Sequence, residues 1–464
     1  MAVKYKCQKC GFIHEGELRD GYYCPFCKVS LFEFKEIKSK KEEPVYNRVF
    51  VDPDNPALMR IEEKCIKCGA CSNTCINIVN IRYKNPKKPI CINCGQCILT
   101  CPTGALVPKY DYNKVLDLIN NPDKTVVVMT SPAVRVALGD AFGYKAGEFL
   151  EGKMVAALKE LGFDYIFDTT FGADLTSMEE AAELQQRVKN EDVLPMFTSC
   201  CPSWVKYASI YHPELLKNIS TCKSPIGMQA AYVRKFFSKE KKIKEKNLVI
   251  VALTPCTAKK YELEKNDCDY VITTSEMTLA IKENNIDFKK LPDVNYDDLV
   301  GSSSGTIYGT SGGVMLSALR CFYYMETGHH LLSNMIYTKE NDFYKEYNVK
   351  INKRIYKTAV VYKMENLEKL LPIKDEFTFI EVMNCNHGCI GGGGQIPMPI
   401  INQKNILNRR SKSLMKKDEE AIVKYPYNNP AIKKAYKIHL KNPLSSISME
   451  NLHTKHNNLS KEFS

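Results

Sequence analysis

The chain has 464 residues, of which 44% are hydrophobic and 25% are charged, a composition typical of a globular protein with roughly three domains. A core of that size is stable without crosslinks, so the 20 cysteines are not needed as disulfide staples and metal binding is their most direct use. The net charge is +12, but the sequence has no arginine-rich arm, RNA-recognition motif or DNA-reading helix. We therefore do not expect a nucleic-acid-binding protein.

The N-terminal segment contains no apolar signal region, because residues 1–5 lead directly into a cysteine pair. The apolar runs at residues 126–129 and 248–253 are far too short to span a bilayer. We therefore expect a protein of the cytoplasm or of an organelle matrix, without membrane contact. In such a reducing compartment, clustered cysteines indicate metal ligands.

The first cysteine group is a pair of Cys-x2-Cys motifs formed by Cys7, Cys10, Cys24 and Cys27. Four thiolates in tetrahedral geometry suit one iron or one zinc ion. The segment up to about Phe34 is too small to fold on its own apolar burial, so metal binding would supply the missing free energy. We expect an aromatic cluster around this site, formed by Tyr5, Phe12, Tyr22, Phe26 and Phe32.

The stretch YKCQKCGFIHEGELRDGYYCPFC, residues 5–27, resembles a rubredoxin, which implies a single redox-active iron. A structural zinc ribbon has the same ligands, and the spacing alone does not separate the two metals. We favour iron and keep zinc as the alternative.

A polar and charged stretch follows at residues 35–47, which predicts a linker. Lysines are dense at residues 35–41 and again at residues 412–417. Such basic stretches are compatible with a solvated surface or with a docking face for an acidic electron carrier.

The second and third cysteine groups share the spacing Cys-x2-Cys-x2-Cys-x3-Cys. In such pairs of runs, three thiolates hold one 4Fe–4S cluster and the fourth cysteine ligates the other cluster. This rule predicts one cluster on Cys65, Cys68, Cys71 and Cys101, and a second on Cys91, Cys94, Cys97 and Cys75. The repeat resembles bacterial two-cluster ferredoxins over about 55 residues. Ile76 stands where that pattern usually has proline, which removes no ligand.

The C-terminal region alternates short apolar runs with helical stretches, which is typical of parallel α/β sheets. The predicted strands are residues 125–129, 165–167, 193–197, 248–253, 270–273, 359–362 and 377–383, and the predicted helices include residues 152–161 and 177–188. Three strands run into cysteines, Cys201, Cys256 and Cys385, and Cys389 follows shortly after. Because the crevice of such sheets lies at the carboxyl ends of the strands, these four thiols should converge on one more 4Fe–4S cluster.

The glycines near these cysteines indicate a bulky ligand, because Gly388 and the glycines at 391–394 let the backbone approach where a Cβ would clash with it. Gly309, Gly312 and Gly313 form a second loop of this kind. By contrast, Cys222, Cys268 and Cys321 are isolated in the sequence, and packing is the role that we expect for them.

Three segments, TSCCPSW (198–204), TPCTAKKYE (254–262) and EVMNCNHGCIGGGGQIP (381–397), closely resemble the signature loops of FeFe-hydrogenases. Further similarity covers TSPAVRVALG, FGADLTSMEEAAEL and GTSGGVMLSALR, so that the resemblance spans about residues 57–455. It implies an α/β fold with two parallel-sheet lobes. The implied order is a rubredoxin-like domain at 1–40, a linker at 41–56, an α+β two-cluster ferredoxin domain at 57–120 and a catalytic domain at 121–464.

The resemblance implies that Cys201, Cys256, Cys385 and Cys389 hold the cubane of an H-cluster, with Cys389 also bridging to a diiron unit that carries CO, CN and an azadithiolate. Lys259 looks like the residue that hydrogen-bonds a cyanide ligand. Pro132, Met383, Ser131 and Thr254 look like walls of the pocket. The implied activity is that of a ferredoxin hydrogenase, 2H⁺ + 2e⁻ ⇌ H₂. The implied partners are ferredoxin or flavodoxin and hydrogenase maturation proteins, in the cytoplasm or a hydrogenosome-like matrix.

Several positions depart from the commonest pattern of the family. Thr254 replaces a methionine, Ala258 a serine and Ser131 an alanine. Asn386 and His387 replace proline and glycine, and one extra residue precedes Pro397. No ligand is lost, but polarity beside the cluster sets its potential, so these changes put the preferred direction of turnover in doubt.

A proton route is also implied by the resemblance. Glu180, Glu183 and Arg187 are spaced so that they share one helix face, which by itself indicates only a solvated ion pair. In FeFe-hydrogenases the matching positions form a relay, with the order Arg187, Glu183, Ser220, Glu180 and Cys200 in this numbering. Two other functions stay open, an iron–sulfur assembly factor and a hydrogen or redox sensor.

Overall fold

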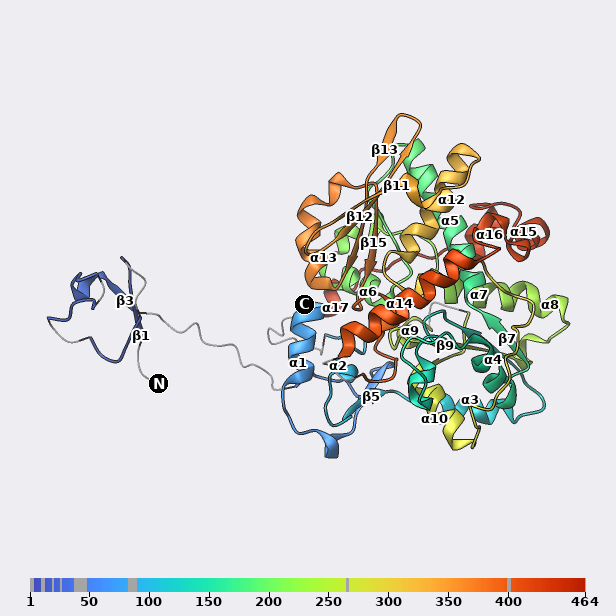
Figure 1. Cartoon of the computed structure of the whole chain (residues 1–464), viewed down its shortest axis with the longest axis horizontal. Coiled ribbons are helices and arrows are strands. Elements are labelled where there is room, and N and C mark those ends of the chain that lie inside the picture. Colours follow the sequence, from blue (N-terminus) through green and yellow to red (C-terminus); the bar gives the residue numbers. More distant parts are fainter. Residues whose placement is uncertain are drawn as a thin grey trace. The chain divides into compact units, whose positions relative to one another are not determined.

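The computed structural model describes residues 4–9, 13–18, 21–25, 27–36, 48–81, 90–263, 267–398 and 402–463 (Figure 1). By its contacts the chain divides into two compact units, Met1–Tyr46 and Asn47–Ser464, and each is described by itself. Cys10, Phe12 and Phe26 lie outside the described residues, as does most of the predicted linker.

The N-terminal unit contains a three-stranded antiparallel sheet in the order β2-β1-β3, formed by β1 (Lys4–Cys7), β2 (Ile13–Glu15) and β3 (Phe34–Glu36). Its small core is made of Cys7, Cys24 and Phe34, with Tyr5 and Tyr22 packed against it. The predicted place of Phe32 in this cluster is wrong, because its side chain is 88% exposed. Phe34 takes that place and meets Tyr22 edge to face at 5.5 Å.

The cysteine-rich part of the larger unit has a two-stranded antiparallel sheet, β4 (Leu58–Arg60) with β5 (Leu106–Pro108), and two short helices, α1 (Ala70–Thr74) and α2 (Gln96–Leu99). A π-helical turn, Cys75–Val79, continues α1, so Ile76 lies within helical backbone. Val49 and Asn55 are buried in this unit, which begins ahead of the predicted domain boundary at residue 57.

The first large sheet is fully parallel, in the order β10-β9-β6-β7, with bounds β6 (Thr125–Thr130), β7 (Tyr165–Asp168), β9 (Leu248–Thr254) and β10 (Tyr270–Thr273). Alternate side chains of β6 enter different cores: Val126 and Val128 pack on one face, and Val127 and Met129 on the other. Helices therefore cover both faces, as expected for a buried parallel sheet.

The second large sheet is mixed, in the order β11-β12-β14-β15-β8 with β13 beside β12. Its strands are β8 (Met196–Phe197), β11 (Ile336–Glu340), β12 (Lys345–Ile351), β13 (Arg354–Tyr356), β14 (Thr358–Tyr362) and β15 (Phe379–Met383). Only β14, β15 and β8 are parallel, and the antiparallel strands β11–β13 are absent from the sequence-based expectation. In Figure 1 this sheet lies in the upper part of the larger unit and the first sheet in the lower part.

The helices of the larger unit surround these sheets. Beyond α1 and α2 they are α3 (Tyr112–Ile119), α4 (Glu151–Glu160), α5 (Thr170–Lys189), α6 (Pro202–Tyr211), α7 (Pro225–Tyr232), α8 (Ser238–Glu240), α9 (Lys259–Glu262), α10 (Thr274–Glu283), α11 (Ser303–Thr306), α12 (Gly313–Thr327), α13 (Met364–Leu370), α14 (Gln403–Glu420), α15 (Pro430–Ala435), α16 (Ser446–Leu452) and α17 (Ser460–Phe463). Among the described residues, no helix is both long enough and apolar enough to cross a membrane.

The α/β class predicted from the sequence is confirmed, and the seven expected strands are all present. Two of the expected extents are wrong. The helix expected at 177–188 begins seven residues earlier, at Thr170, and the strand expected at 193–197 is reduced to Met196–Phe197, because its register with β15 covers only those two residues.

Candidate active site

One buried cavity lies at the carboxyl ends of strands from both large sheets. The segments after β6, β8, β9 and β15 all contribute to its wall, which is the arrangement expected for α/β sheets. The lining includes every residue that the sequence analysis placed at the pocket: Ser131, Pro132, Cys200, Cys201, Thr254, Cys256, Lys259, Met383, Cys385 and Cys389.

Four thiols converge in this cavity, those of Cys201, Cys256, Cys385 and Cys389. Burial raises the pKa of each thiol, that of Cys256 to about 11. Neighbouring thiols add to the increase at Cys256, Cys385 and Cys389. A metal that binds thiolates must therefore displace protons here. Four cysteines from three strand ends in a mostly apolar cavity are a donor set that fits an iron–sulfur centre.

Lys259 supplies a cation to the same cavity from the first residue of α9. Its Nζ donates to Oε2 of Glu262 at 2.7 Å and to the carbonyl oxygen of Cys200 at 3.2 Å. Burial by itself lowers the pKa of Lys259, but the Glu262 carboxylate reverses the effect and raises it. The ammonium is thus held charged in a mostly apolar pocket, where it suits a small anionic ligand.

The cysteine-rich part of the larger unit encloses two further cavities. One is lined by Cys65, Cys68, Cys71 and Cys101, and the other by Cys91, Cys94, Cys97 and Cys75. In each cavity three cysteines come from one run and the fourth comes from the other run. The structure therefore brings together the same two sets of four cysteines that the spacing predicts.

The second of these sets is packed against the loops that carry Cys256 and Cys389. Thr257 donates its hydroxyl to the carbonyl of Asn93 at 2.7 Å, and the Gln96 amide donates to the carbonyl of Gly391 at 2.8 Å. A Cβ on Gly393 would collide with the backbone of Cys94. The glycines at 391–394 are therefore needed mainly for contact between protein segments, and only Gly388 and Gly392 of this region line the cavity.

His387, which stands in place of a usual glycine, has a φ of 59°, in the left-handed region where glycine carries no steric cost. Its ring stacks on Tyr362 with the centroids 5.7 Å apart. The substitution therefore keeps the backbone shape of the loop and adds an aromatic contact next to the cysteines.

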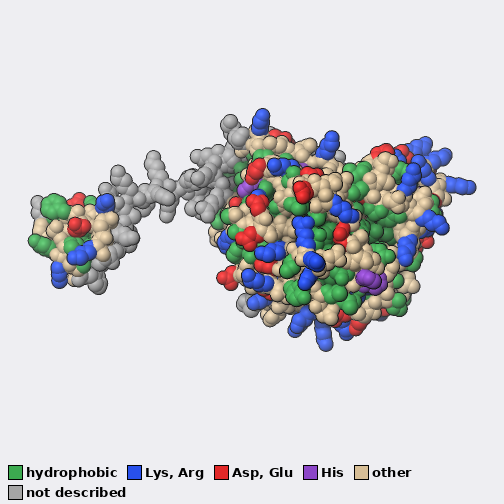
Figure 2. All heavy atoms as spheres, turned by 90° about the horizontal axis from the view of Figure 1, so that it is seen from above, with side chains coloured by type: hydrophobic (Ala, Val, Ile, Leu, Met, Phe, Trp, Pro, Cys, Tyr) green, Lys and Arg blue, Asp and Glu red, His purple; other side chains and the backbone are tan. Residues whose placement is uncertain are grey.

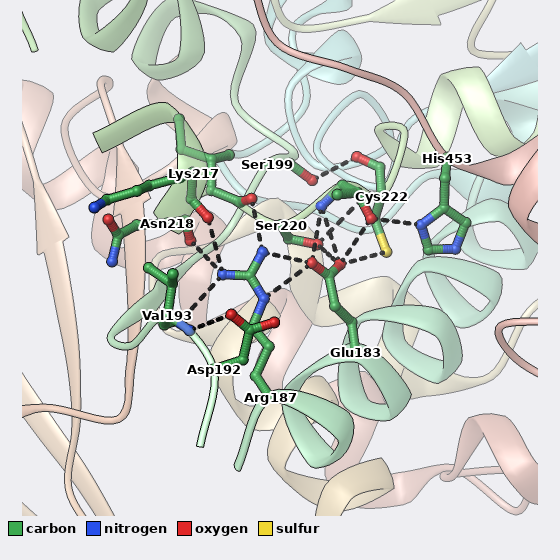
Figure 3. A network of polar contacts seen from close by, with 12 residues as sticks. Glu183, Arg187, Asp192, Val193, Ser199, Lys217, Asn218, Ser220, Cys222 and His453 are labelled. Carbon is green, nitrogen blue, oxygen red and sulfur yellow. Dashed lines mark hydrogen bonds and ion pairs between the residues drawn. The ribbon is translucent and has the colours of Figure 1, made fainter. Parts of the chain in front are cut away.

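The helix face predicted for proton transfer is buried rather than solvated. Figure 3 shows Glu183 and Arg187 of this face with their polar partners. Nη2 of Arg187 lies 2.7 Å from Oε1 of Glu183, and Oε2 of Glu183 accepts from the Ser220 hydroxyl at 2.8 Å. The guanidinium also donates to four carbonyl oxygens, those of Val193, Lys217, Asn218 and Ile219. The structure thus joins three of the five relay residues by direct hydrogen bonds.

Glu180 and Cys200 are near this network without being bonded into it. Both carboxylate oxygens of Glu180 are buried and have no hydrogen-bond partner among the described residues. The backbone of Ser199 and the side chain of Ser220 nevertheless act to lower its pKa. Burial, and then the charge of Glu183, outweighs them and raises the pKa of Glu180 to about 8. Burial, and then Glu180, raises the pKa of Cys200 well above its usual range.

Two residues of the same network were not found from the sequence. Thr221 donates its backbone N–H to Oε2 of Glu183 at 3.0 Å, and its hydroxyl lies 2.8 Å from Nδ1 of His453. Cys222, which was expected to be isolated, lies beside them, with its Sγ 3.9 Å from Oε2 of Glu183. No motif could have revealed His453, because it is 232 residues away from Thr221 in the chain.

In the N-terminal unit, the thiols of Cys7, Cys24 and Cys27 lie within 4.8 Å of one another, as ligands of one metal ion would. The fourth predicted ligand, Cys10, lies outside the described residues.

Comparison with known proteins agrees with this site. The family described as "Iron only hydrogenase large subunit, C-terminal domain" matches residues 124–393, and "Iron hydrogenase small subunit" matches residues 404–458. The NADP-reducing hydrogenase subunit HndD of Solidesulfovibrio fructosivorans is 37% identical over 86% of this chain and 74% of its own length. Iron hydrogenase 1 of Clostridium pasteurianum is 36% identical over 93% of this chain and 81% of its own length.

A solved structure of a variant of the FeFe-hydrogenase HydA1 from Chlamydomonas reinhardtii superimposes with a TM-score of 0.67 at 32% identity, over 75% of this chain and 98% of that one. More distant similarity extends to a probable cytosolic Fe-S cluster assembly factor of Dictyostelium discoideum, 28% identical over 73% of this chain and 76% of its own length. The family matches, the relatives and the fold agree that this chain belongs to the iron-only hydrogenases.

Proposed function

We propose that the protein is a hydrogenase that interconverts protons, electrons and H₂, with a ferredoxin-like carrier as electron donor or acceptor. The observation that supports this most is the convergence of the four cysteines, Lys259 and Cys200 in one cavity, in a chain of the iron-only hydrogenase family. The division of the larger unit into a ferredoxin-like and a catalytic part belongs to the same proposal.

The residues that would hold the H-cluster cubane are Cys201, Cys256, Cys385 and Cys389, and Cys389 would also bind the diiron unit. When bound, this group supplies the chemistry that interconverts protons, electrons and H₂. The protein would position the group and exclude water from it. Lys259 offers an N–H to a small anion on the cavity wall, held in place by Glu262. Pro132, Met383, Ser131 and Thr254 enclose the remaining space.

Two accessory 4Fe–4S clusters would be held by the two cysteine sets at residues 65–101, and they supply electron transfer when bound. An iron would be held by the N-terminal cysteines, with zinc as the alternative.

Lys and Arg side chains are spread over the visible face of the larger unit, with acidic and apolar side chains between them (Figure 2). An acidic carrier such as ferredoxin or flavodoxin suits a chain with a net charge of +12. We place the protein itself in the cytoplasm or a hydrogenosome-like matrix, with hydrogenase maturation proteins as further partners.

Protons would move between Arg187 and the cavity through Glu183, Ser220, Glu180 and Cys200. The Ser220 hydroxyl already bonds Glu183, and it can exchange its proton with Glu180 by rotation or through water. A carboxyl with a pKa of about 8 is protonated or ionised with little free-energy cost near neutral pH, which suits Glu180 for both acid and base roles. The Cys200 thiol would hold the last proton at the cavity wall.

The rival function is that of an iron–sulfur assembly factor, which the more distant relatives support. The higher identity to hydrogenases and the buried relay favour the enzyme. A redox or hydrogen sensor is the other alternative, and the hydrogen bonds that join Arg187, Glu183 and Ser220 favour the enzyme over it.

Infrared spectroscopy of protein produced together with maturation proteins tests the proposal. We expect CO and CN stretching bands together with H₂ production from a reduced electron carrier. Protein that holds its cubanes but shows neither bands nor turnover would instead be an assembly factor or a sensor.

A further inference from the structure

Arg187 stands at the outer end of the proposed relay, but its guanidinium cannot release a proton there. Arginine stays protonated in proteins, and its N–H groups only donate hydrogen bonds. In this structure they donate to the Glu183 carboxylate and to four backbone carbonyl oxygens. Arg187 therefore holds Glu183 in place, and the exchange of protons between Glu183 and solvent needs a different group.

His453 reaches Glu183 through a single hydroxyl. Its Nδ1 lies 2.8 Å from Oγ1 of Thr221, which in turn lies 3.2 Å from Oε2 of Glu183. In Figure 3 the ring is on the side of Glu183 away from the Arg187 guanidinium. A nitrogen of His453 and an oxygen of Glu183 are within 4.8 Å of each other, a gap that one hydroxyl bridges. Unlike a guanidinium, an imidazole takes up and releases protons in the physiological pH range.

Backbone pairing fixes His453 beside Thr221. The N–H of Thr454 donates to the carbonyl oxygen of Thr221 at 2.7 Å, and Cys222 and His453 are opposite each other in an antiparallel bridge. His453 is 8% exposed, whereas Ser220, the next member of the relay after Glu183, is 0% exposed. The imidazole is therefore at the end of the network that is closer to solvent.

Glu179 holds the other nitrogen of the ring. Nε2 of His453 lies 3.2 Å from Oε2 of Glu179. The Glu179 carboxyl also accepts hydrogen bonds from three further donors, the Tyr436 hydroxyl, the Ser448 hydroxyl and the backbone N–H of Leu444. A carboxyl surrounded by donors is an ionised acceptor, so Nε2 carries a hydrogen and points it at Glu179.

With Nε2 protonated, Nδ1 has two possible states. In the neutral ring, Nδ1 accepts a hydrogen bond from the Thr221 hydroxyl. In the charged ring, Nδ1 donates to the Thr221 oxygen, and the hydroxyl is free to donate to Glu183. Both states use the same two contacts, at 2.8 and 3.2 Å, so a proton can pass between ring and carboxylate without movement of the heavy atoms.

We propose that His453 is the residue through which the relay exchanges protons with solvent, by way of the Thr221 hydroxyl and Glu183, with Glu179 positioning the ring. The inference rests on the proposed hydrogenase function. In the inward step the Nδ1–H bond breaks and the Thr221 oxygen takes that proton. The original hydroxyl proton forms an O–H bond with Oε2 of Glu183, and no electron moves. The ring, now neutral, is protonated again by water.

The test uses the full chain with all its cofactors, with hydrogen turnover as the readout and the CO and CN infrared bands as the measure of loading. His453→Ala removes the ring. Thr221→Val keeps the size of the side chain and removes the hydroxyl between the ring and Glu183. His439→Ala is the matched control, because His439 is another partly buried histidine of the C-terminal segment, and its ring contacts Glu240 at 2.9 Å.

We expect both variants to keep their infrared bands and to lose turnover by roughly a hundredfold, the lower end of general acid–base catalysis. The double variant should lose no more than either single variant, since both interrupt one path. The His439 variant should turn over like the wild type. Full turnover in either His453→Ala or Thr221→Val would overturn the proposal.

Chemical rescue separates proton exchange from a structural role of the ring. Added imidazole should restore turnover in His453→Ala but not in Thr221→Val, which lacks the hydroxyl. Pyrazole has the same size but is not protonated near neutral pH, so it should not restore turnover. Equal rescue by both compounds would show that the ring only fills space. Wild-type protein without bands or turnover would overturn the hydrogenase function itself, whereas an active wild type with active variants would overturn only the role of His453.

Discussion

Arg187 and Glu183 form an ion pair inside the protein, with Nη2 and Oε1 2.7 Å apart and both side chains less than a tenth exposed. Glu183 receives further hydrogen bonds from Ser220 and Thr221, so the carboxylate is fully bonded. The pair thus places a fully hydrogen-bonded carboxylate next to Glu180, whose own carboxyl has no hydrogen-bond partner among the described residues. This contrast between two carboxyls one helical turn apart is the electrostatic basis of the proposed relay.

Removal of one partner of this pair should be costly. Arg187→Met leaves the buried Glu183 carboxylate uncompensated, and we expect a loss of about 3–5 kcal/mol in the free energy of unfolding. The double variant Arg187→Met/Glu183→Gln removes both charges and should recover part of the loss. Urea unfolding measures both variants, and equal stability of the single and double variants would show that the pair is not electrostatically coupled.

The pKa of Glu180 makes folding depend on pH. The carboxyl ionises near 4.5 in the unfolded chain but near 8 in the folded protein, so the folded state binds more protons between these values and stability falls as the pH rises across that window. Glu180→Gln removes this dependence. Relative to the wild type, the variant should gain stability with rising pH, by at most about 1.4 kcal/mol per pH unit. Parallel unfolding profiles of the two proteins across the window would contradict the assignment.

The two groups nearest the cavity should be essential for proton transfer. Cys200→Ala and Glu180→Gln should retain all clusters but lose roughly two or more orders of magnitude in hydrogen turnover, the scale of general acid–base catalysis. Cys321→Ala is the control, because Cys321 is buried in a core cluster that contains neither group. If either relay variant assembles fully and turns over like the control, the route is different.

Cys389 is the proposed bridge to the diiron unit. Cys389→Ser should abolish the CO and CN infrared bands and hydrogen turnover, while the spectra of the two accessory clusters persist. Accessory spectra serve as the internal control in the same sample. Turnover at the wild-type rate would disprove the assignment of this cavity.

Metal content distinguishes iron from zinc in the N-terminal unit. Fully loaded protein should contain three cubanes, the diiron unit and one further iron, so that mutation of Cys7 to serine removes a single iron. The measurement is elemental analysis of variant and wild type. One zinc per chain in the wild type would replace the rubredoxin-like assignment with a zinc ribbon and leave the other centres untouched.

The sequence predicted the convergence of the four cysteines well because three of them follow strands that are recognisable by their apolar runs. Cys201, Cys256 and Cys385 each come within a few residues of a strand end, and the rule for parallel sheets then places them together. The cysteine spacing likewise grouped Cys75 with Cys91 and Cys101 with Cys65.

Other features depended on contacts that no local pattern carries. The strands β11–β13 are half exposed and antiparallel, so they lack the continuous apolar run of the buried strands. His453 reaches Thr221 from the C-terminal segment, and the lack of a hydrogen-bond partner for Glu180 among the described residues is visible only when its neighbours are known. For the same reason the sequence did not reveal that glycines at 391–394, of which Gly392 lines the cavity, also contact the distant Cys94 and Gly95.

The contact of Gly393 with the backbone of Cys94 and Gly95 also limits how the protein can change over time. Neither glycine can gain a side chain unless the opposite segment moves, so the cysteine-rich segment and the last catalytic loop must be inherited or exchanged as a pair. A chimera joined between them would bring two mismatched surfaces together, whereas a graft that replaces residues 1–46 leaves this contact intact.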